Sequence, residues 1–309
     1  MIVPQLLKVT DGLYYFESRT VSPFAVSGVY LIVRGEVVLI EAGTSISVPH
    51  LLNAIEGLGI DLARITTLIP THVHLDHAGG AGRLVEKLPH LKVWVHTRGL
   101  KHLADPSRLI QSAEVLYGTR ENITRLHGEI LPIPADNLVG IEDGFVPLAG
   151  GPGLQTLDTP GHAPHHLSIY DPVSQSLFCG EALGHYLPEY RLLYPAVAPP
   201  AFDLAISRAS IEKLRAVNPA RICFSQFGWR ADPEWVFSEI DRQLDYYARL
   251  VKAGLDQGLA VAGIVERLAE SLASRGMPGP AVSGEMLLSI VLGYKLYFER
   301  RSNECQPHR

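Results

Sequence analysis

The stretch THVHLDHAGG, residues 71–80, decides both the fold and the chemistry expected of this chain. Four side chains that can bind a metal lie close together within it: His72, His74, Asp76 and His77. Two histidines one residue apart on an extended backbone point to the same side. A turn after them brings Asp76 and His77 toward a second point nearby. The stretch therefore predicts two adjacent half-sites for zinc or a similar ion.

An apolar strand leads into this stretch and a helix follows it. The patterns predict the strand at residues 66–70 and the helix at residues 81–88. Four such side chains could gather by chance on a polar loop. Here they follow a buried strand, at the carboxyl end where α/β folds place their chemistry. The context therefore favours a metal site.

The pattern HxHxDH after a strand resembles the signature of the metallo-β-lactamase superfamily, which includes glyoxalase II, lactonases and many phosphoesterases. By the order of its motifs, the resemblance covers about residues 5–230. It implies a mixed α/β (α+β) chain that folds as a four-layer αββα sandwich.

The turn DTPGH at residues 158–162 matches the next motif of that family. The resemblance implies that His162 completes the first half-site as its third histidine. Three imidazoles and one water form a catalytic zinc shell. His165 and His166 follow closely but have no ligand position in the family pattern, so a structural role is favoured for both.

Three positions depart from the family pattern. Glu41 stands where the resemblance implies an aspartate that supports the metal loop, and Glu181 where it implies an aspartate that bridges two ions. Each glutamate displaces its carboxylate by about a bond length. Gln226 stands where a histidine often binds the second ion, and an amide oxygen is a poorer zinc ligand. We therefore expect the second half-site to hold its ion weakly.

The long connection of residues 184–200 is rich in proline and tyrosine. Long loops beside a site tend to carry specificity. The candidates for a weak ligand or a substrate contact are Gln226, His185, Tyr186 and Tyr190, with Arg191 and Tyr194 in the same loop. An alternative of equal weight is that these aromatic side chains have no role in binding and only pack the loop onto the rest of the protein. His185 could approach the metals, which the sequence alone does not establish.

Composition bounds the class of protein. Of 309 residues, 47% are hydrophobic, and a net charge of −5 without a basic block argues against a nucleic-acid partner. No apolar run reaches the length of a membrane span, and the first residues lack a signal-peptide pattern. The cysteines Cys179, Cys223 and Cys305 are far apart and odd in number, which predicts no disulfide framework. We expect a reduced, cytoplasmic protein with a small-molecule substrate and no membrane partner.

Hydrophobic periodicity and turn residues place the other elements. Strands are predicted at residues 13–16, 26–33, 37–40, 92–96, 154–157, 166–170, 176–179 and 221–224. Helices are predicted at residues 48–58, 100–103, 107–117 and 202–216. The candidate ligands outside the first motif therefore follow the ends of predicted strands.

The last part of the chain is expected to be helical. Its helices are predicted at residues 233–257, 261–274 and 283–301, with a glycine- and proline-rich break at 276–280. We predict two domains, an αββα domain at residues 1–230 and a helical appendage at 231–309 that packs on the same body. The resemblance implies that the appendage caps the cleft or forms a homodimer contact; the alternative is additional core.

The leading hypothesis is a metal-dependent hydrolase with one or two zinc ions, although iron or manganese also fits the donors. The first half-site is His72, His74 and His162; the second is Asp76, His77 and Glu181, with Gln226 near. The resemblance implies that a metal-bound hydroxide attacks a small ester, lactone, thioester or phosphoester. Asp76 would bind the second ion and orient the nucleophile.

Two other functions stay open. A mononuclear iron oxygenase similar to the persulfide dioxygenases could use His72, His162 and Glu181, although the retained Asp76 and His77 argue against it. A non-catalytic metal-binding protein with a degraded second site is favoured by Glu181 and Gln226 alone. The intact set of histidines argues against a loss of catalytic function.

Overall fold

The computed structural model describes residues 6–19, 26–149, 151–274 and 283–304. Contacts within the chain divide it into two compact units, each assembled from three segments. Unit 1 comprises Met1–Asp158, His165–Gly180 and Val217–Ala231, and unit 2 comprises Thr159–Pro164, Glu181–Ala216 and Asp232–Arg309. The division at residue 230 stays a prediction. Cys305 and the expected break at 276–280 lie outside the described residues.

Unit 1 contains a seven-stranded sheet in the order β1-β2-β3-β4-β5-β6-β7. Its strands are β1 (Leu6–Thr10), β2 (Leu13–Arg19), β3 (Val26–Val33), β4 (Val37–Ile40), β5 (Ile65–Ile69), β6 (Lys92–His96) and β7 (Leu138–Ile141). The strands from β1 to β4 pair antiparallel, whereas β4 to β7 run parallel. Every residue of β4 is buried, as expected for an apolar strand covered on both faces.

The second sheet of unit 1 has the order β15-β14-β11-β10-β9-β8. Its strands are β8 (Gly144–Leu148), β9 (Gly151–Asp158), β10 (Leu167–Asp171), β11 (Ser176–Gly180), β14 (Arg221–Phe224) and β15 (Trp229–Arg230). An apolar core joins the two sheets, in which the ring of Tyr30 packs 5.1 Å from that of Phe178. The Tyr30 hydroxyl donates to the carbonyl of Phe224 at 2.8 Å, so this core also fixes the end of β14.

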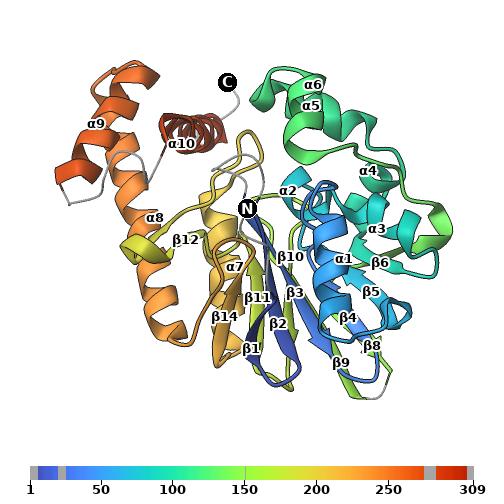
Figure 1. The fold of residues 1–309 in the computed structure, drawn as a ribbon. Helices are drawn as coiled ribbons and strands as arrows, with labels where there is room; N and C mark the ends of the chain where they lie inside the picture. Colours follow the sequence, from blue (N-terminus) through green and yellow to red (C-terminus); the bar gives the residue numbers. More distant parts are fainter. Residues whose placement is uncertain (1–5, 20–25, 150, 275–282, 305–309) are drawn as a thin grey trace. The chain divides into compact units, whose positions relative to one another are not determined.

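Helices cover the outer face of the first sheet, where Figure 1 shows α1 and α3 beside β4, β5 and β6. The helices of unit 1 are α1 (Val48–Gly57), α2 (Leu75–Ala78), α3 (Ala81–Lys87), α4 (Leu100–Ala104), α5 (Ser107–Tyr117) and α6 (Arg120–His127). Buried apolar residues of α1 and α3, including Leu51 and Leu84, form one cluster with the sheet. Burial of these apolar side chains against the sheet holds the parallel strands in place. Leu75 of α2, Ile110 of α5 and Ile123 of α6 form a separate cluster.

Unit 2 is mainly helical. It contains β12 (His185–Leu187), β13 (Leu192–Tyr194), α7 (Leu204–Ala216), α8 (Pro233–Asp256), α9 (Val261–Ser274) and α10 (Gly284–Glu304). Figure 1 shows α9 and α10 beside the long helix α8. The Tyr246 hydroxyl of α8 donates to Ser271 of α9, and the Tyr294 hydroxyl of α10 donates to the Leu244 carbonyl of α8. The described residues contain no helix with the length and apolar character needed to cross a bilayer.

The structure corrects several predicted elements. Residues 184–200 were expected to be irregular, but they contain the antiparallel hairpin of β12 and β13. Each strand of this hairpin has three residues, too few for a period-2 pattern to be recognised. The elements β1, β7, β8, β15, α2 and α6 were also missed, because they are short or largely polar.

Candidate metal centre

Strand β5 carries the HxHxDH stretch at its carboxyl end, in the parallel part of the first sheet. His74 caps the short helix α2, and its carbonyl accepts from the backbone N–H of Ala78 at 2.8 Å. The backbone N–H of Ala42 donates to the His77 carbonyl at 2.7 Å, which ties α2 to the end of β4. The backbone therefore fixes both ends of this stretch.

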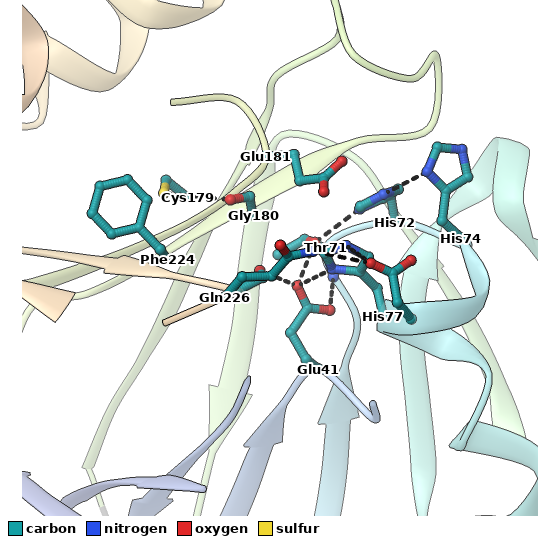
Figure 2. A network of polar contacts seen from close by, with 12 residues as sticks. Glu41, Thr71, His72, His74, His77, Cys179, Gly180, Glu181, Phe224 and Gln226 are labelled. Carbon is teal, nitrogen blue, oxygen red and sulfur yellow. Dashed lines mark hydrogen bonds and ion pairs between the residues drawn. The ribbon is translucent and has the colours of Figure 1, made fainter. Parts of the chain in front are cut away.

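Hydrogen bonds set the tautomer of His72. The Thr71 hydroxyl donates to Oε1 of Glu41 at 2.6 Å, so it can only accept from the nearby Nδ1 of His72, at 3.1 Å. A neutral His72 therefore carries its lone pair on Nε2. That atom faces Nδ1 of His74 at 2.9 Å, so a proton of His74 or a bound ion lies between the two nitrogens. Figure 2 shows this line of contacts from Glu41 to His74.

The same carboxylate sets the tautomer of His77. Nδ1 of His77 donates to Oε1 of Glu41 at 2.9 Å, which leaves the lone pair of a neutral ring on Nε2. Nε2 lies 3.2 Å from Oδ2 of Asp76. A lone pair and a carboxylate oxygen at that distance require a positive charge, which a proton or a metal ion supplies. The donors of Asp76 and His77 therefore fit a divalent cation.

Glu41 is a buried hub with 1% of its surface exposed. Besides Thr71 Oγ1 and His77 Nδ1, it accepts from the Thr71 backbone N–H at 2.9 Å and from the Ser225 hydroxyl at 2.6 Å. Its φ of 70° lies in the left-handed region, which costs a glutamate on the order of 1 kcal/mol. The longer side chain thus reaches its partners from a strained backbone.

Gln226 follows β14 and faces Asp76. Its Nε2 donates to Oδ2 of Asp76 at 3.2 Å, and Figure 2 shows its side chain above Glu41. The preceding Ser225 is held on both sides, because its carbonyl accepts from the Gly28 N–H at 2.6 Å. The Gln226 amide therefore acts as a hydrogen-bond donor that orients the Asp76 carboxylate.

Two histidines that the sequence favoured as structural lie against the first motif. The buried ring of His166 lies 5.1 Å from that of His72, and His165 stacks on His72 at 6.3 Å with an interplanar angle of 16°. A side chain at Gly180 would come within 2.4 Å of Nε2 of His166. The ring of His102 of α4, which no sequence pattern singled out, lies 6.3 Å from the ring of His165.

The candidate ligands of unit 2 are His162 and Glu181. Nδ1 of His162 faces the Ala196 carbonyl at 3.1 Å and must donate to it, so the lone pair of a neutral ring lies on Nε2. Nε2 faces Oε2 of Glu181 at 2.7 Å. Both side chains are 7% exposed and line a small pocket. The other lining residues are Pro160, Ala182, Gly184, Pro195, Ala196, Phe202, Ser207, Ser210, Ile211, Ile240 and Leu244.

Helix α7 positions the turn that carries His162. Gly161 has a φ of 132°, and a Cβ there would lie 2.4 Å from Oγ of Ser207, so only glycine fits. The Asp203 N–H donates to the Gly161 carbonyl, and the Ser210 hydroxyl donates to the Pro160 carbonyl. The proline-glycine turn therefore packs directly on α7.

The residues of the β12–β13 hairpin differ in their surroundings. Nε2 of His185 lies 3.3 Å from Oε1 of Glu181. Tyr186 is buried with its ring 6.1 Å from Trp235, as the packing alternative expects, whereas Tyr190 is 43% exposed. Arg191 stacks over the ring of Trp235. His185 is thus the hairpin side chain that contacts a candidate ligand.

Residues 23–226 match the family model described as the metallo-beta-lactamase superfamily. The chain belongs to the metallo-β-lactamase superfamily. The predicted fold class, a mixed α/β fold of this type with additional C-terminal helices, is confirmed. In this superfamily member the candidate ligands fall into two sets: unit 1 holds His72, His74, Asp76 and His77, and unit 2 holds His162 and Glu181.

Individual relatives of this metallo-β-lactamase superfamily chain are distant. It is 26% identical over 195 residues to the metallo-beta-lactamase fold-containing protein ST1585 of Sulfurisphaera tokodaii, covering 62% of this chain and 68% of that protein. It is 26% identical over 121 residues to a hydroxyacylglutathione hydrolase of Synechococcus, covering 39% of this chain and only 36% of that relative. The solved structure of TTHA1429, a metallo-beta-lactamase family protein from Thermus thermophilus, matches with a TM-score of 0.68 at 19% identity, over 96% of this chain and 95% of that one. That likeness shows the fold alone.

Proposed function

We propose that the chain is a metal-dependent hydrolase of a small ester, lactone, thioester or phosphoester. The ligands of its metal centre are His72, His74, Asp76 and His77 of unit 1 with His162 and Glu181 of unit 2. The observation that carries the proposal is the His77–Asp76 pair. Glu41 forces the lone pair of His77 toward a carboxylate oxygen 3.2 Å away, an arrangement that a bound cation satisfies.

Chain connectivity supports joining the two sets. Glu181 directly follows Gly180 of β11, so their Cα atoms lie about 3.8 Å apart. His162 precedes His165 by three residues, a span of at most about 11 Å, and the His165 ring stacks on His72. Both unit 2 ligands therefore lie within a few chain positions of residues that belong to unit 1.

A divalent ion held by these residues would polarise the substrate oxygen and activate a water molecule for attack. The chain's own residues prepare for that chemistry. Glu41 holds His72 and His77 in the tautomers that present Nε2, and Gln226 holds Asp76 by its Oδ2 atom. Asp76 would then orient the nucleophile. The small pocket beside His162 and Glu181 is lined largely by apolar side chains.

The test combines metal analysis with a substrate panel. Protein purified without added metal is assayed by elemental analysis and against a glutathione thioester, an acyl lactone, a nitrophenyl ester and a nitrophenyl phosphodiester. The thioester is included because one relative is named hydroxyacylglutathione hydrolase. We expect bound zinc and turnover of at least one substrate, abolished by chelation and restored by zinc.

Two variants and one control locate the activity. His72→Ala and His162→Ala each remove a proposed ligand, one from each unit, and both should lose at least about a thousandfold in turnover. His90→Gln changes an exposed histidine and should not alter turnover. Full activity in either alanine variant contradicts the assignment. Bound iron together with oxygen uptake and no hydrolysis would show that the chain is an oxygenase and contradict the proposed hydrolase function.

A further inference from the structure

The carboxylate of Glu181 has a different histidine at each oxygen. Oε2 faces Nε2 of His162 at 2.7 Å, and Oε1 faces Nε2 of His185 at 3.3 Å. All three side chains belong to unit 2 and come from separate local structures: the Pro-Gly turn, the residue that follows β11, and the start of β12. The first histidine is part of the proposed centre, whereas the second has no role in it so far.

The turn between Glu181 and His185 determines how close they are. The Gly184 N–H donates to the Glu181 carbonyl at 3.0 Å, which closes a tight turn. Gly184 has a φ of 78°, and a Cβ there would lie 2.3 Å from the Tyr194 carbonyl. Only glycine fits this turn, and β12 starts at the next residue. The backbone therefore directs His185 back toward Glu181.

The ring of His185 is also held from the side. His185 pairs with Tyr194 across the β12–β13 ladder, and their rings stack 5.0 Å apart at an interplanar angle of 29°. Tyr194 is itself fixed, because it is 3% exposed and its hydroxyl contacts Sδ of Met286 at 3.9 Å. The imidazole is thus positioned before any ligand binds, while 16% of the side chain stays exposed.

The distance between Nε2 of His185 and Oε1 of Glu181 is compatible with two ligands of one ion. Two ligands at about 2.1 Å from one ion lie about 3.0–3.4 Å apart when their angle at the ion is between 90° and 109°. The observed 3.3 Å falls in this range. Gln226 supplies no imidazole, and Nε2 of its amide donates to Asp76.

We propose that His185 is a metal ligand and supplies an imidazole to the ion that Oε1 of Glu181 binds. This inference rests on the proposed function, since it requires Glu181 to be a ligand. It adds a third imidazole-bearing segment to the centre, the β12–β13 hairpin. That ion then has the donors Glu181 and His185 within unit 2, without an imidazole at position 226.

The test compares wild type with His185→Gln, which cannot bind a metal through an imidazole but keeps an N–H donor for Glu181. Metal content is measured by elemental analysis, the affinity of each ion by chelator competition, and the ligand field by visible absorption of the cobalt-substituted protein. We expect wild type to bind about two ions. The variant should bind about one, because the affinity for the more weakly held ion falls at least tenfold. The cobalt spectrum should change because a nitrogen ligand is lost.

Two further variants make the result specific. His90→Gln should keep wild-type stoichiometry and spectrum. The double variant His185→Gln with Gln226→His should recover the second ion, because it returns an imidazole beside Asp76. If His185→Gln keeps both ions and the wild-type cobalt spectrum, His185 is not a ligand and only this inference fails. If wild type binds no metal, the proposed function fails and this inference fails with it.

Discussion

Replacement of Glu41 by glutamine tests the hub that positions the first motif. The carboxylate accepts four hydrogen bonds, from the Thr71 N–H, the Thr71 hydroxyl, Nδ1 of His77 and the Ser225 hydroxyl. Three of them end on Oε1 and one, from the Thr71 N–H, ends on Oε2. An amide keeps an oxygen for the first three but turns an NH2 group toward the Thr71 N–H.

The expected effect follows from these four bonds. The buried Thr71 N–H loses its acceptor, which costs about 1–3 kcal/mol, and the other three bonds lose their charged acceptor at roughly 0.5–1 kcal/mol each. Release of a buried charge offsets part of this sum. We expect the free energy of unfolding of Glu41→Gln to fall by about 3–4 kcal/mol, and its metal affinity to fall about 10–100-fold.

The assay is urea unfolding of metal-free protein, so that metal binding does not contribute, followed by chelator competition on the metal-loaded protein. Glu41→Asp is the matched variant. It keeps the charge and tolerates the left-handed φ better, but it is shorter by one methylene, so a loss of about 1–2 kcal/mol is expected. A Glu41→Gln variant within about 1 kcal/mol of wild type would refute the reasoning.

Three other predictions concern backbone, pH and metal. Gly180→Ala should lower the free energy of unfolding by about 2–4 kcal/mol, because the new Cβ would lie 2.4 Å from His166 at a φ of 54°. In the same denaturant titration, the control Gly263→Ala should raise the free energy of unfolding by about 0.5–1 kcal/mol, because its Cβ meets nothing within 4 Å. Burial raises the pKa of the Cys223 thiol and of Tyr30, so the stability they contribute is complete below their unfolded pKa values of about 9 and 10 and decreases as the pH rises above them. Denaturant unfolding at pH 8 and pH 10.5 should show that fall, and a flat profile would contradict it. Chelation should lower the melting temperature, and excess zinc should restore it by the equivalent of about 3 kcal/mol at a hundredfold excess over the dissociation constant, which differential scanning fluorimetry would detect.

The sequence predicted the class of fold because its longest signals are apolar strands before polar turns. Strand β4 and strand β5 are buried runs, and the position of the HxHxDH stretch after β5 followed from that. The β12–β13 hairpin escaped prediction because three-residue strands have no measurable period. Its stability comes from tertiary contacts, such as that between Tyr186 and Trp235, which a local pattern does not contain.

Local spacing also could not reveal how side chains far apart in the chain share a hydrogen bond. Glu41 and Ser225 are separated by 184 positions, and their contact depends on the register of both sheets. The sequence identified Gln226 as a weak donor to a metal, and the structure shows its amide donating to Asp76. Likewise, His166 was expected to be structural, but its contact with His72 could only be seen once β10 was placed.

Charge balance connects the number of bound ions to the proposed chemistry. In the proposed centre the histidines are neutral, so Asp76 and Glu181 contribute two negative charges and the adjacent Glu41 a third. One divalent ion leaves this group with a net charge of −1, which repels an anionic nucleophile and a developing oxyanion. Two ions bring the net charge to +1, which attracts both. Two ions therefore suit the proposed chemistry better than one, and an additional imidazole such as that of His185 matters because Gln226 carries none.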